Sequence, residues 1–214
     1  MDNDISSTRH SYERGALDAS TVAADPFVQF GVWLDEALRA ELLEPNAMTV
    51  ATVGSDGQPS ARIVLLRGWD ERGFVFFTNY ESHKGHDLAH TPRAALLFFW
   101  PPLERQIRIE GCVERLASAD SDLYFSKRPR GHKLSAWASQ QSSVVRDRTD
   151  LEAQMRAQDE RFDQGDVPRP TSWGGYRVKP ARFEFWQGRR NRVHDRIAYR
   201  RLPGTPWRIE RLAP

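Results

Sequence analysis

The chain has 214 residues, of which 39% are hydrophobic and 28% are charged, and its formal net charge is +2 at pH 7. This length is sufficient for a hydrophobic core, and the single cysteine, Cys112, excludes an internal disulfide framework and a cysteine-based zinc cluster. No apolar run approaches a membrane span and the first residues lack the features of a signal peptide, so we expect a soluble, cytoplasmic protein.

The N-terminal residues 1–24 are polar and show no apolar periodicity, which predicts a flexible arm. Asp25 followed by Pro26 is typical of a helix N-cap with proline at the first helical position. Apolar residues then recur at spacings of three and four, which predicts an amphipathic helix that ends near Glu44 and Pro45. The apolar stripe consists of Phe27, Phe30, Trp33, Leu34, Ala37 and Leu38.

A two-residue periodicity begins at Ala47 and predicts a series of short strands. The predicted strands cover residues 47–53, 60–67, 73–79, 93–100 and 105–116, with a turn from Trp69 to Gly73 and a helical or loop insert at 82–90. Because the connections are too short for crossover helices, these strands should be largely antiparallel. The pattern predicts a β-barrel or a strongly curled sheet.

Helical patterns follow the fifth strand, and the chain then returns to strands. The helical segments start at Ser118, surround residues 134–142 and cover 149–165, and the later strands are expected at 174–187, 195–201 and 206–212. The sequence contains neither an internal repeat nor a recognisable linker. We therefore predict an α+β fold in which residues 25–214 form a single domain around a largely antiparallel β-barrel with flanking helices.

Several common site motifs are absent from the sequence. It contains no glycine-rich nucleotide motif, no HExxH and no GxSxG. His83, His86 and His90 could share a helical face, but no nearby carboxylate or cysteine completes a tetrahedral set, so we favour a solvated face and predict no metal. Acidic residues are interspersed among the numerous arginines, which disfavours the basic patch typical of nucleic-acid-binding proteins. We expect neither nucleic-acid nor membrane partners.

Cationic and hydrogen-bonding side chains gather at the predicted strand ends. Arg62 and Arg67 flank one strand and, by alternation, should point to opposite faces. Either could bind a ligand, or could be a charge that merely flanks the strand. Thr78 ends the next strand, and His83 and Lys84 open the insert that follows. Backbone N–H groups, a hydroxyl group and an ammonium group together predict a phosphate site there.

Three further groups are candidates for ligand contacts. Gln106 lies inside a strand, where its amide either faces solvent or pairs with a heterocycle. Tyr124 and Arg128 are four residues apart on one helical face, which suits a second phosphate or a surface stack of the two side chains. A polar cluster follows at residues 141–143.

The densest group of candidate residues surrounds a predicted turn at Gly188. Alternation would place Arg192, His194 and Arg196 on one side of a resumed strand, near Trp186. Three cationic or titratable groups on one face favour a bound anion. A hairpin held by salt bridges through Asp195 is the alternative interpretation.

Nine short motifs resemble those of the pyridoxine (pyridoxamine) 5′-phosphate oxidase family, in family order and at family spacing. They are RIVLLR, FFTN-x-x-SxK, LERQ, YFxxRPR, AWASxQSS, SWGGYRV, FWQG, RxHDR and RIxRLAP, and the resemblance extends from about Arg9 to Pro214. Each motif is weak by itself, but nine in order are highly specific. The resemblance implies a homodimer with an FMN-binding split-barrel fold and two sites at the subunit interface.

The resemblance also implies which residues form the site. The residues it assigns to FMN are Arg62, Ile63, Val64, Leu65, Leu66, Arg67, Phe77, Thr78, His83, Lys84, Gln106, Gln141, Ser142, Trp186 and Arg196. Those it assigns to the substrate are Arg9, Tyr12, Arg67, Tyr124, Arg128, His132, Arg192 and His194, with Arg192 and His194 as the catalytic residues.

The implied activity is the FMN-dependent oxidation of pyridoxamine 5′-phosphate and pyridoxine 5′-phosphate to pyridoxal 5′-phosphate, with O2 reduced to H2O2. Five positions depart from the family pattern. Arg67 stands where lysine is usual, His83 replaces an arginine, Phe77 a tyrosine, His132 a serine and Ser135 a glycine. We expect retained function with altered affinity, because a histidine can still donate to phosphate and Arg67 preserves the charge.

Two alternatives remain open at this point. One is another flavin oxidase on the same scaffold, such as the enzymes of phenazine assembly, since a fold does not fix a function. The other is a non-catalytic split-barrel module that binds flavin, haem or vitamin B6 phosphate. The presence of Tyr124, Arg128, Arg192 and His194 favours the vitamin B6 substrate.

Overall fold

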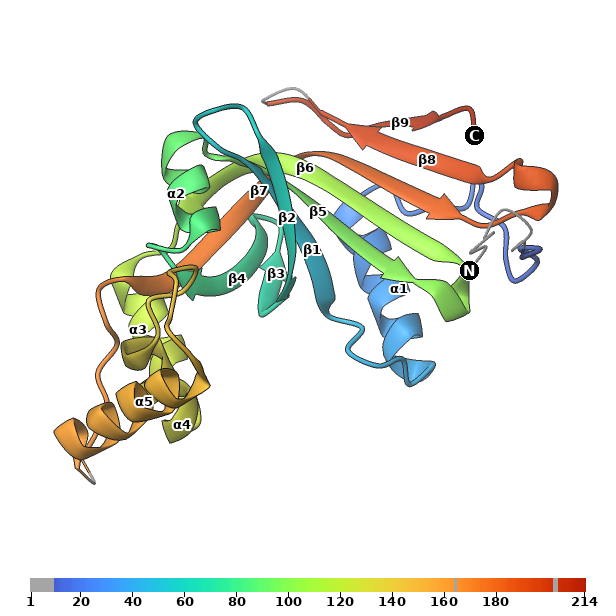
Figure 1. Ribbon diagram of the computed structural model, residues 1–214. Helices are drawn as coiled ribbons and strands as arrows, with labels where there is room; N and C mark the ends of the chain where they lie inside the picture. The colour runs from blue at the N-terminus through green and yellow to red at the C-terminus, as the bar shows by residue number, and fades with distance from the viewer. Residues whose placement is uncertain (1–9, 164, 202–203) are drawn as a thin grey trace. The chain divides into compact units, whose positions relative to one another are not determined.

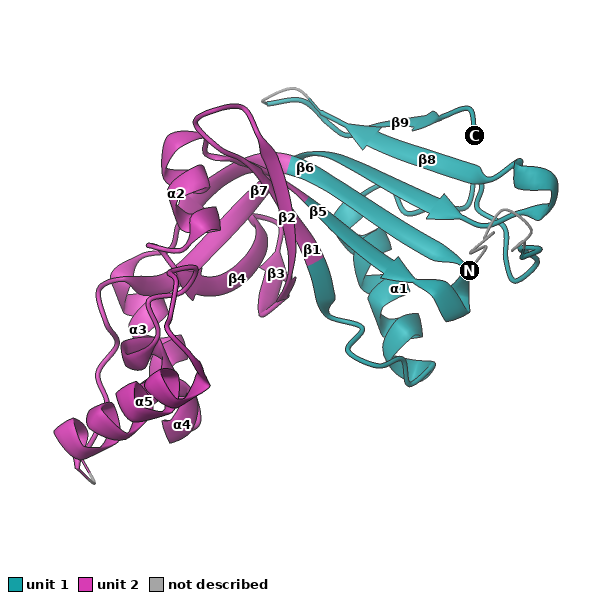
Figure 2. Cartoon of the chain, in the orientation of Figure 1, with its two compact units in different colours: residues 1–48, 96–110, 180–214 teal, residues 49–95, 111–179 magenta. Residues whose placement is uncertain are grey.

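The computed structural model describes residues 10–163, 165–201 and 204–214. The chain divides into two compact units, shown in different colours in Figure 2. Unit 1 comprises residues 1–48, 96–110 and 180–214, and unit 2 comprises residues 49–95 and 111–179. The organisation of residues 25–214 as a single domain stays a prediction.

The described strands belong to one nine-stranded sheet with the order β2-β1-β5-β6-β7-β4-β3, in which β8 pairs with β7 and β9 with β8 (Figure 1). Strand β4 pairs with β3 and with β7, and β8 pairs with β7 and with β9, all antiparallel. This confirms the predicted α+β fold with a largely antiparallel sheet. The strands are β1 (Ala47–Val53), β2 (Pro59–Leu65), β3 (Gly68–Asp70), β4 (Gly73–Asn79), β5 (Arg93–Trp100), β6 (Arg105–Arg115), β7 (Trp173–Gln187), β8 (Asp195–Arg200) and β9 (Arg208–Arg211).

Five α-helices and two short 3-10 helices are described, with α1 before the first strand and the others between strands. They are α1 (Pro26–Arg39), α2 (His83–His90), η1 (Pro101–Leu103), α3 (Ser118–Ser126), α4 (Arg130–Ala138), α5 (Arg148–Phe162) and η2 (Arg190–Arg192). None of them is long and apolar enough to cross a membrane.

The core of unit 1 is built from aromatic residues of α1 and of its strands. Phe27 packs edge-on against Phe183, with ring centroids 5.2 Å apart, and Trp33 packs against Phe185 at 5.3 Å. All four side chains are at most 5% exposed. Edge-to-face packing of this kind adds to the free energy gained from burial. The predicted apolar stripe of the first helix is therefore its buried face, although Leu38 is exposed.

The core of unit 2 includes β4, a strand whose residues are almost all buried. Phe76 packs against Tyr176 with ring centroids 5.6 Å apart, which joins β4 to the paired part of β7. Helix α4 packs against α5 in the same unit (Figure 1). Helix α2 follows β4 directly, and this short connection carries the candidate phosphate site.

Several boundaries differ from the sequence predictions: β2 ends at Leu65, α4 lies four residues earlier than expected, and the largest differences are at the end of α1 and at Trp69. Helix α1 begins as expected, with the Asp25 side chain accepting from the Phe27 N–H, but it ends at Arg39 and not near Glu44. Glu41 and Glu44 have positive φ angles of 51° and 46°. Helix ends with positive φ usually carry glycine, and because glutamate stands at both positions here, the sequence gives no signal that the helix ends at Arg39. In addition, residues predicted to form a turn at Trp69 form strand β3, where Trp69 pairs with Phe74.

Candidate active site

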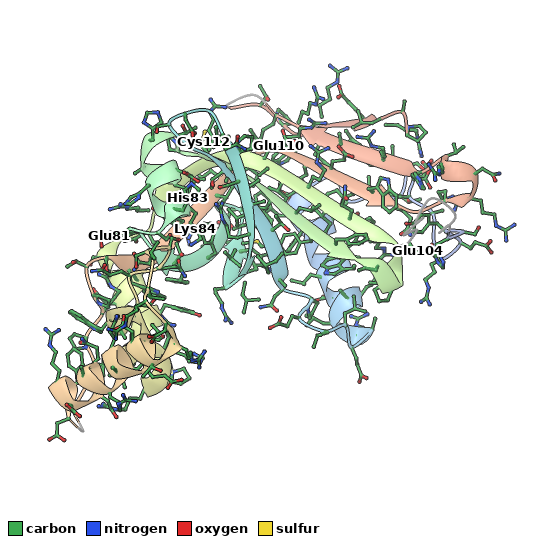
Figure 3. The ribbon with its side chains drawn as sticks, in the orientation of Figure 1. Glu81, His83, Lys84, Glu104, Glu110 and Cys112 are labelled. Carbon is green, nitrogen blue, oxygen red and sulfur yellow. The ribbon has the colours of Figure 1, made fainter. Side chains whose placement is uncertain are left out.

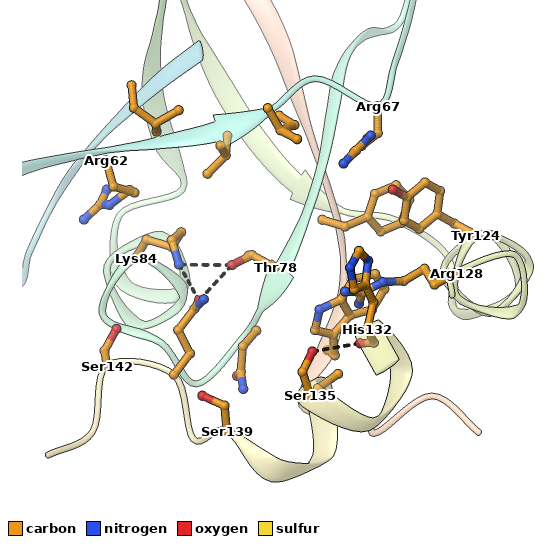
Figure 4. A pocket seen from close by; sticks show the side chains of 18 of the residues that line it. Arg62, Arg67, Thr78, Lys84, Tyr124, Arg128, His132, Ser135, Ser139 and Ser142 are labelled. Atoms are coloured by element: carbon orange, nitrogen blue, oxygen red, sulfur yellow. Dashed lines mark hydrogen bonds between the residues drawn. The ribbon is translucent and has the colours of Figure 1, made fainter. Parts of the chain in front are cut away.

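Unit 2 contains a pocket of about 1130 Å³ that gathers most of the predicted cofactor and phosphate residues (Figure 4). The predicted residues that line it are Arg62, Ile63, Val64, Leu65, Arg67, Phe77, Thr78, His83, Lys84, Tyr124, Arg128, His132, Gln141 and Ser142, and Ser135 lines it as well. Sequence segments from β2, β4, α2, α3 and α4 therefore converge on one cavity.

Lys84 is a buried cation in this pocket. Its ammonium group donates hydrogen bonds to Thr78 Oγ1 at 3.0 Å and to Gln141 Oε1 at 2.7 Å (Figure 4). It also donates to Ser82 Oγ at 3.0 Å. Burial lowers the pKa of Lys84 to about 8, and the charge of Arg62 acts in the same direction, whereas Asp87 opposes it. A buried ammonium group with a lowered pKa is poised to gain from a bound anion.

The first turn of α2 supplies backbone donors beside Lys84. Ser82 caps the helix by accepting from the Gly85 N–H, and the His83 N–H donates to Ser142 Oγ at 3.2 Å. A side chain at Gly85 would meet the Tyr80 carbonyl oxygen at 1.9 Å, so only glycine permits this close turn. The helix N-terminus thus adds partial positive charge to the pocket.

Arg62 donates hydrogen bonds to Thr52 Oγ1 at 2.6 Å and to Ser60 Oγ, and it lies beside a buried carboxylate that the sequence analysis overlooked. Asp87, which is 4% exposed, lies 3.7 Å from Arg62 Nη2 and 3.5 Å from His83 Nε2. Thr52 Oγ1 donates to the same carboxylate at 2.6 Å. Asp87 follows His83 by four residues on α2, so helical spacing could have identified this pair. A carboxylate therefore does lie beside these histidines, and the expectation that they bind no metal stays a prediction.

Aromatic rings line another part of the pocket. Phe77 and Tyr124 stack with centroids 3.8 Å apart and planes 8° from parallel, and Trp173 stacks on Phe77 at 5.4 Å. The Arg128 guanidinium lies 4.5 Å from the Trp173 ring centroid. Trp173 lies in the SWGGYRV motif, but the sequence analysis gave it no role in the site.

Arg128 has an unsatisfied donor. Its Nη1 atom is buried and has no hydrogen-bond partner among the residues that the structure describes. Burial lowers the pKa of Arg128, and the positive charge of Arg67 lowers it further, whereas Tyr124 opposes the shift. A buried guanidinium N–H that lacks an acceptor, beside a second guanidinium, favours an anionic ligand with oxygen acceptors.

Arg62 and Arg67 line the same pocket, so the prediction that they point to opposite faces is wrong. Strand β2 ends at Leu65, and the two-residue alternation does not continue to Arg67. The alternation argument failed because it assumed an uninterrupted strand. Leu66, which the resemblance also assigns to FMN, is buried and is not among the residues that line the pocket.

The remaining predicted residues lie in unit 1. Tyr12, Trp186 and His194 form an aromatic cluster, in which the His194 ring is 4.6 Å from Trp186 and 5.5 Å from Tyr12. The Arg189 N–H donates to His194 Nδ1 at 3.1 Å, which leaves the ring proton on Nε2. Burial lowers the pKa of His194, and the charge of Arg192 adds to this effect. His194 is therefore a neutral hydrogen-bond donor at neutral pH.

Arg192 and Arg196 do not share the strand geometry that alternation predicted. Arg192 belongs to η2 and has a positive φ of 60°, while β8 begins only at Asp195. Arg196 Nε donates to the buried Glu184 carboxylate at 2.8 Å, so this charge is already paired. Asp195 forms a salt bridge across the Gly188 turn with Arg189 at 3.5 Å, as the hairpin alternative expects, and a second one with Arg211 of β9 at 2.8 Å.

Two predicted residues lie apart from these groups. Gln106 is a half-buried residue of β6 in unit 1 and is not among the pocket residues. Arg9 lies outside the described residues. The pocket also contains polar residues that sequence reasoning missed, among them Asn79, Lys127 and Ser139. Lys127 precedes Arg128 in the chain and is the one of these whose charge could have been noticed.

The chemistry of the pocket follows from this lining. Cationic donors stand beside aromatic and aliphatic side chains, a composition suited to planar, phosphorylated ligands. Arg62 and Lys84 form one cationic group, and Arg67 and Arg128 form another. The pocket can therefore accept more than one anionic group.

Comparison with known proteins identifies a family for the whole chain. Residues 34–160 match the family described as pyridoxamine 5′-phosphate oxidase, and residues 173–214 match the pyridoxine 5′-phosphate oxidase C-terminal dimerisation region. A Burkholderia multivorans protein named pyridoxine/pyridoxamine 5′-phosphate oxidase is 57% identical over 98% of this chain and 99% of its own length. The protein of the same name from Bordetella pertussis is also 57% identical, with the same coverage.

Solved structures agree on the fold. PhzG from Burkholderia lata 383, in complex with tetrahydrophenazine-1-carboxylic acid, is 31% identical and superposes with a TM-score of 0.86 over 94% of this chain and all of that chain. A pyridoxamine 5′-phosphate oxidase-related, FMN-binding protein from Nostoc punctiforme has a TM-score of 0.71 over 90% of this chain at 17% identity, which shows the fold alone. The split-barrel fold expected from the motifs is thus confirmed, and the chain belongs to the pyridoxamine 5′-phosphate oxidase family.

Proposed function

We propose that the chain is an FMN-dependent oxidase that converts pyridoxamine 5′-phosphate and pyridoxine 5′-phosphate to pyridoxal 5′-phosphate. O2 accepts the two electrons and becomes H2O2; the amine substrate also consumes water and releases ammonia. The observation that carries this proposal is the pocket with paired cationic groups and the unsatisfied Arg128 N–H, which calls for a phosphorylated ligand. The relatives at 57% identity support the same assignment.

The residues around Lys84 fit the phosphate of FMN. The Lys84 ammonium, the Arg62 guanidinium and the N-terminus of α2 supply positive charge, and Asp87 prevents Arg62 from turning away. His83 replaces the usual arginine and offers an imidazole donor that lies 3.5 Å from Asp87. When bound, FMN supplies the two-electron oxidation at C4′ and the subsequent reaction with O2.

The residues around Arg128 fit the phosphate of the substrate. Arg67 and Arg128 repel each other in the absence of an anion, and a phosphate would satisfy Nη1 of Arg128. Tyr124 adds a hydroxyl donor, and His132 lines the same pocket. These side chains would fix one end of the substrate, so that orientation and not affinity alone determines the rate.

Arg192 and His194 are assigned to the reacting end of the substrate. His194 is neutral and has its proton on Nε2, so it would donate a hydrogen bond to the pyridine substituents and would not begin as a general base. Arg192 would supply positive charge on the same side. We further infer that the chain forms a homodimer with the sites at its interface, which the match of residues 173–214 to a dimerisation region supports.

A second candidate is an oxidase of a phenazine precursor. The likeness to PhzG, at 31% identity and a TM-score of 0.86, favours it specifically. Substrate phosphate distinguishes the two candidates, since the tetrahydrophenazine carboxylate bound to PhzG carries none. Two guanidinium groups close together, those of Arg67 and Arg128, match a dianionic phosphate better than a singly charged carboxylate, which favours the phosphorylated substrate.

An anaerobic titration tests the proposal directly. FMN-reconstituted protein is mixed with pyridoxine 5′-phosphate, and the flavin absorbance is followed before and after air is admitted. We expect bleaching, the appearance of an aldehyde absorbance and recovery of the flavin band in air. Bleaching only by a reduced phenazine carboxylate would support the second candidate, and a bound flavin that no donor bleaches would indicate a binding module.

A further inference from the structure

Glu104 is a buried carboxylate that the proposed mechanism does not use. It lies where η1 ends and β6 begins, it is only 4% exposed, and it is labelled in Figure 3. Its backbone is in the left-handed region, with φ 54° and ψ 40°, a conformation that residues other than glycine rarely adopt. A buried charge on such a backbone needs strong partners.

The partners of Glu104 are backbone groups of the N-terminal segment. Its Oε2 atom accepts from the Glu13 N–H at 2.8 Å and from the Arg14 N–H at 2.9 Å. His10 Nε2 lies 3.5 Å from Oε1. One carboxylate therefore holds two successive amides about ninety positions away in the chain.

This contact fixes the neighbouring Tyr12. The Tyr12 ring packs edge-on against Trp186 at 5.7 Å and against His194 at 5.5 Å. Gly188 leaves the space for this ring, because a Cβ atom there would lie 2.7 Å from Tyr12. The Gly188 N–H in turn donates to the Glu104 carbonyl oxygen at 2.8 Å. The side-chain carboxylate and the backbone carbonyl of Glu104 thus bind the two segments that bring Tyr12 against His194.

We propose that Glu104 is a positioning residue, whose carboxylate anchors the N-terminal segment through the Glu13 and Arg14 amides and so holds Tyr12 against His194. The effect on the reaction rests on the proposed function, in which His194 orients the substrate. The anchoring itself does not. Because the anchor binds backbone amides, the identity of residues 13 and 14 is unimportant for it, whereas that of Tyr12 is important.

Hydrogen exchange of the full-length holoprotein measures the anchor directly. In Glu104→Leu, which cannot accept a hydrogen bond, the amides of Glu13 and Arg14 should exchange at least about tenfold faster, while those of β7 keep their protection. In Glu104→Gln the amide oxygen can still accept, so most protection should remain. Glu13→Gln is the matched control, because it removes only the exposed ion pair with Arg190 and keeps the anchored N–H.

Steady-state kinetics measure the consequence for the reaction. Glu104→Leu should raise KM for pyridoxine 5′-phosphate about tenfold, with a smaller change in kcat and an unchanged dissociation constant for FMN. In Glu104→Gln, KM should stay close to the wild-type value. Unchanged exchange at residues 13 and 14 in Glu104→Leu would overturn the anchor, and accelerated exchange with an unchanged KM would overturn the positioning role.

Two complications have defined readings. If Glu104→Leu does not fold, Gly188→Ala displaces Tyr12 without touching the carboxylate, and it must raise KM while residues 13 and 14 stay protected. If Gly188→Ala leaves KM unchanged, the positioning role is wrong. If the wild-type protein oxidises no vitamin B6 phosphate, the proposed function fails, and the exchange experiment still decides whether Glu104 is the anchor.

Discussion

At the scale of single residues, Lys84 shows how ligand binding and stability oppose each other. Three oxygen acceptors surround its ammonium group, yet burial and Arg62 lower its pKa from 10.5 to about 8. The unfolded chain therefore binds this proton more tightly than the folded chain does. The resulting loss of folding stability is fully present below about pH 8 and disappears as the pH rises from about 8 to 10.5.

Replacing Lys84 by methionine should separate the two effects. We expect the dissociation constant for FMN to rise about 10-fold to 100-fold, since a hydrogen bond to a charged group contributes about 1.5–3 kcal/mol. The ligand-free protein should melt at the same temperature or higher, because a buried charge is removed. Flavin fluorescence titration and thermal unfolding of the apoprotein measure both quantities. Lys179→Met, which removes an exposed lysine paired with Glu114, is the control.

The affinity for FMN should also depend on pH through Lys84. Above about pH 8 the free protein loses the Lys84 proton and must recover it on binding, so the dissociation constant should rise by up to about tenfold per pH unit. The same titration from pH 6.5 to 9.5 should show no such rise in Lys84→Met. A rise of equal slope in both proteins would assign the effect to another group.

Arg192 belongs to the substrate in the proposed mechanism, so its removal should affect turnover and not cofactor binding. Arg192→Leu is expected to lower kcat/KM by about 100-fold, or about 2.7 kcal/mol, with less than about a twofold change in FMN affinity. Arg190→Leu, at an exposed arginine of the same 3-10 helix, should leave kcat/KM nearly unchanged. Equal losses of turnover and FMN affinity in Arg192→Leu would contradict the assignment.

Sequence reasoning identified site residues by chemical type and motif, and it missed those that act through folding. Lys84, Arg62 and Arg128 were selected by their motifs, whereas chemical type alone left a flanking or surface charge open for Arg62 and Arg128; all three line the pocket. Glu104 was not predictable, since its partners are amides that carry no side-chain signal and lie far away in the chain. Trp173 was quoted in a motif, but only the stack with Phe77 reveals its contact with the pocket.

At the scale of elements, periodicity predicted the long strands well and the ends of elements poorly. Strands β1, β4 and β5 agree with the predicted ranges, because apolar residues occupy the positions that are buried, either alternately or continuously. The end of α1 and the short strand β3 depend on backbone turns and cross-strand pairing, which local composition does not encode. The same limitation misplaced Arg67 and Arg192 relative to their neighbours.

Helix α2 depends on one glycine for its position. Gly85→Ala should destabilise the protein by about 1–3 kcal/mol, because the new methyl group meets the Tyr80 backbone and the helix must move. FMN affinity should fall as well, since His83 and Lys84 move with the helix. Gly131→Ala on α4 has open space around it and should be neutral or stabilising by up to about 1 kcal/mol. Denaturant unfolding and flavin titration compare the two.

At the scale of the whole molecule, the proposed dimer makes a prediction about cofactor binding. Each chain has a mass of 24.6 kDa, so light scattering should give about 49 kDa. If the sites lie at the interface, dilution below the dimer dissociation constant should release FMN together with the partner chain. A monomeric protein that retains FMN at high dilution would contradict this arrangement.

The unsatisfied guanidinium of Arg128 also has a consequence for handling the protein. A group that lacks an acceptor in the free pocket does not distinguish the phosphate of a substrate from inorganic phosphate or sulfate in a buffer. Such anions should compete with the substrate and protect the protein against heat at the same time. Kinetic constants from phosphate buffer would then understate the affinity for the substrate, and a melting temperature from sulfate solution would overstate the stability of the free enzyme.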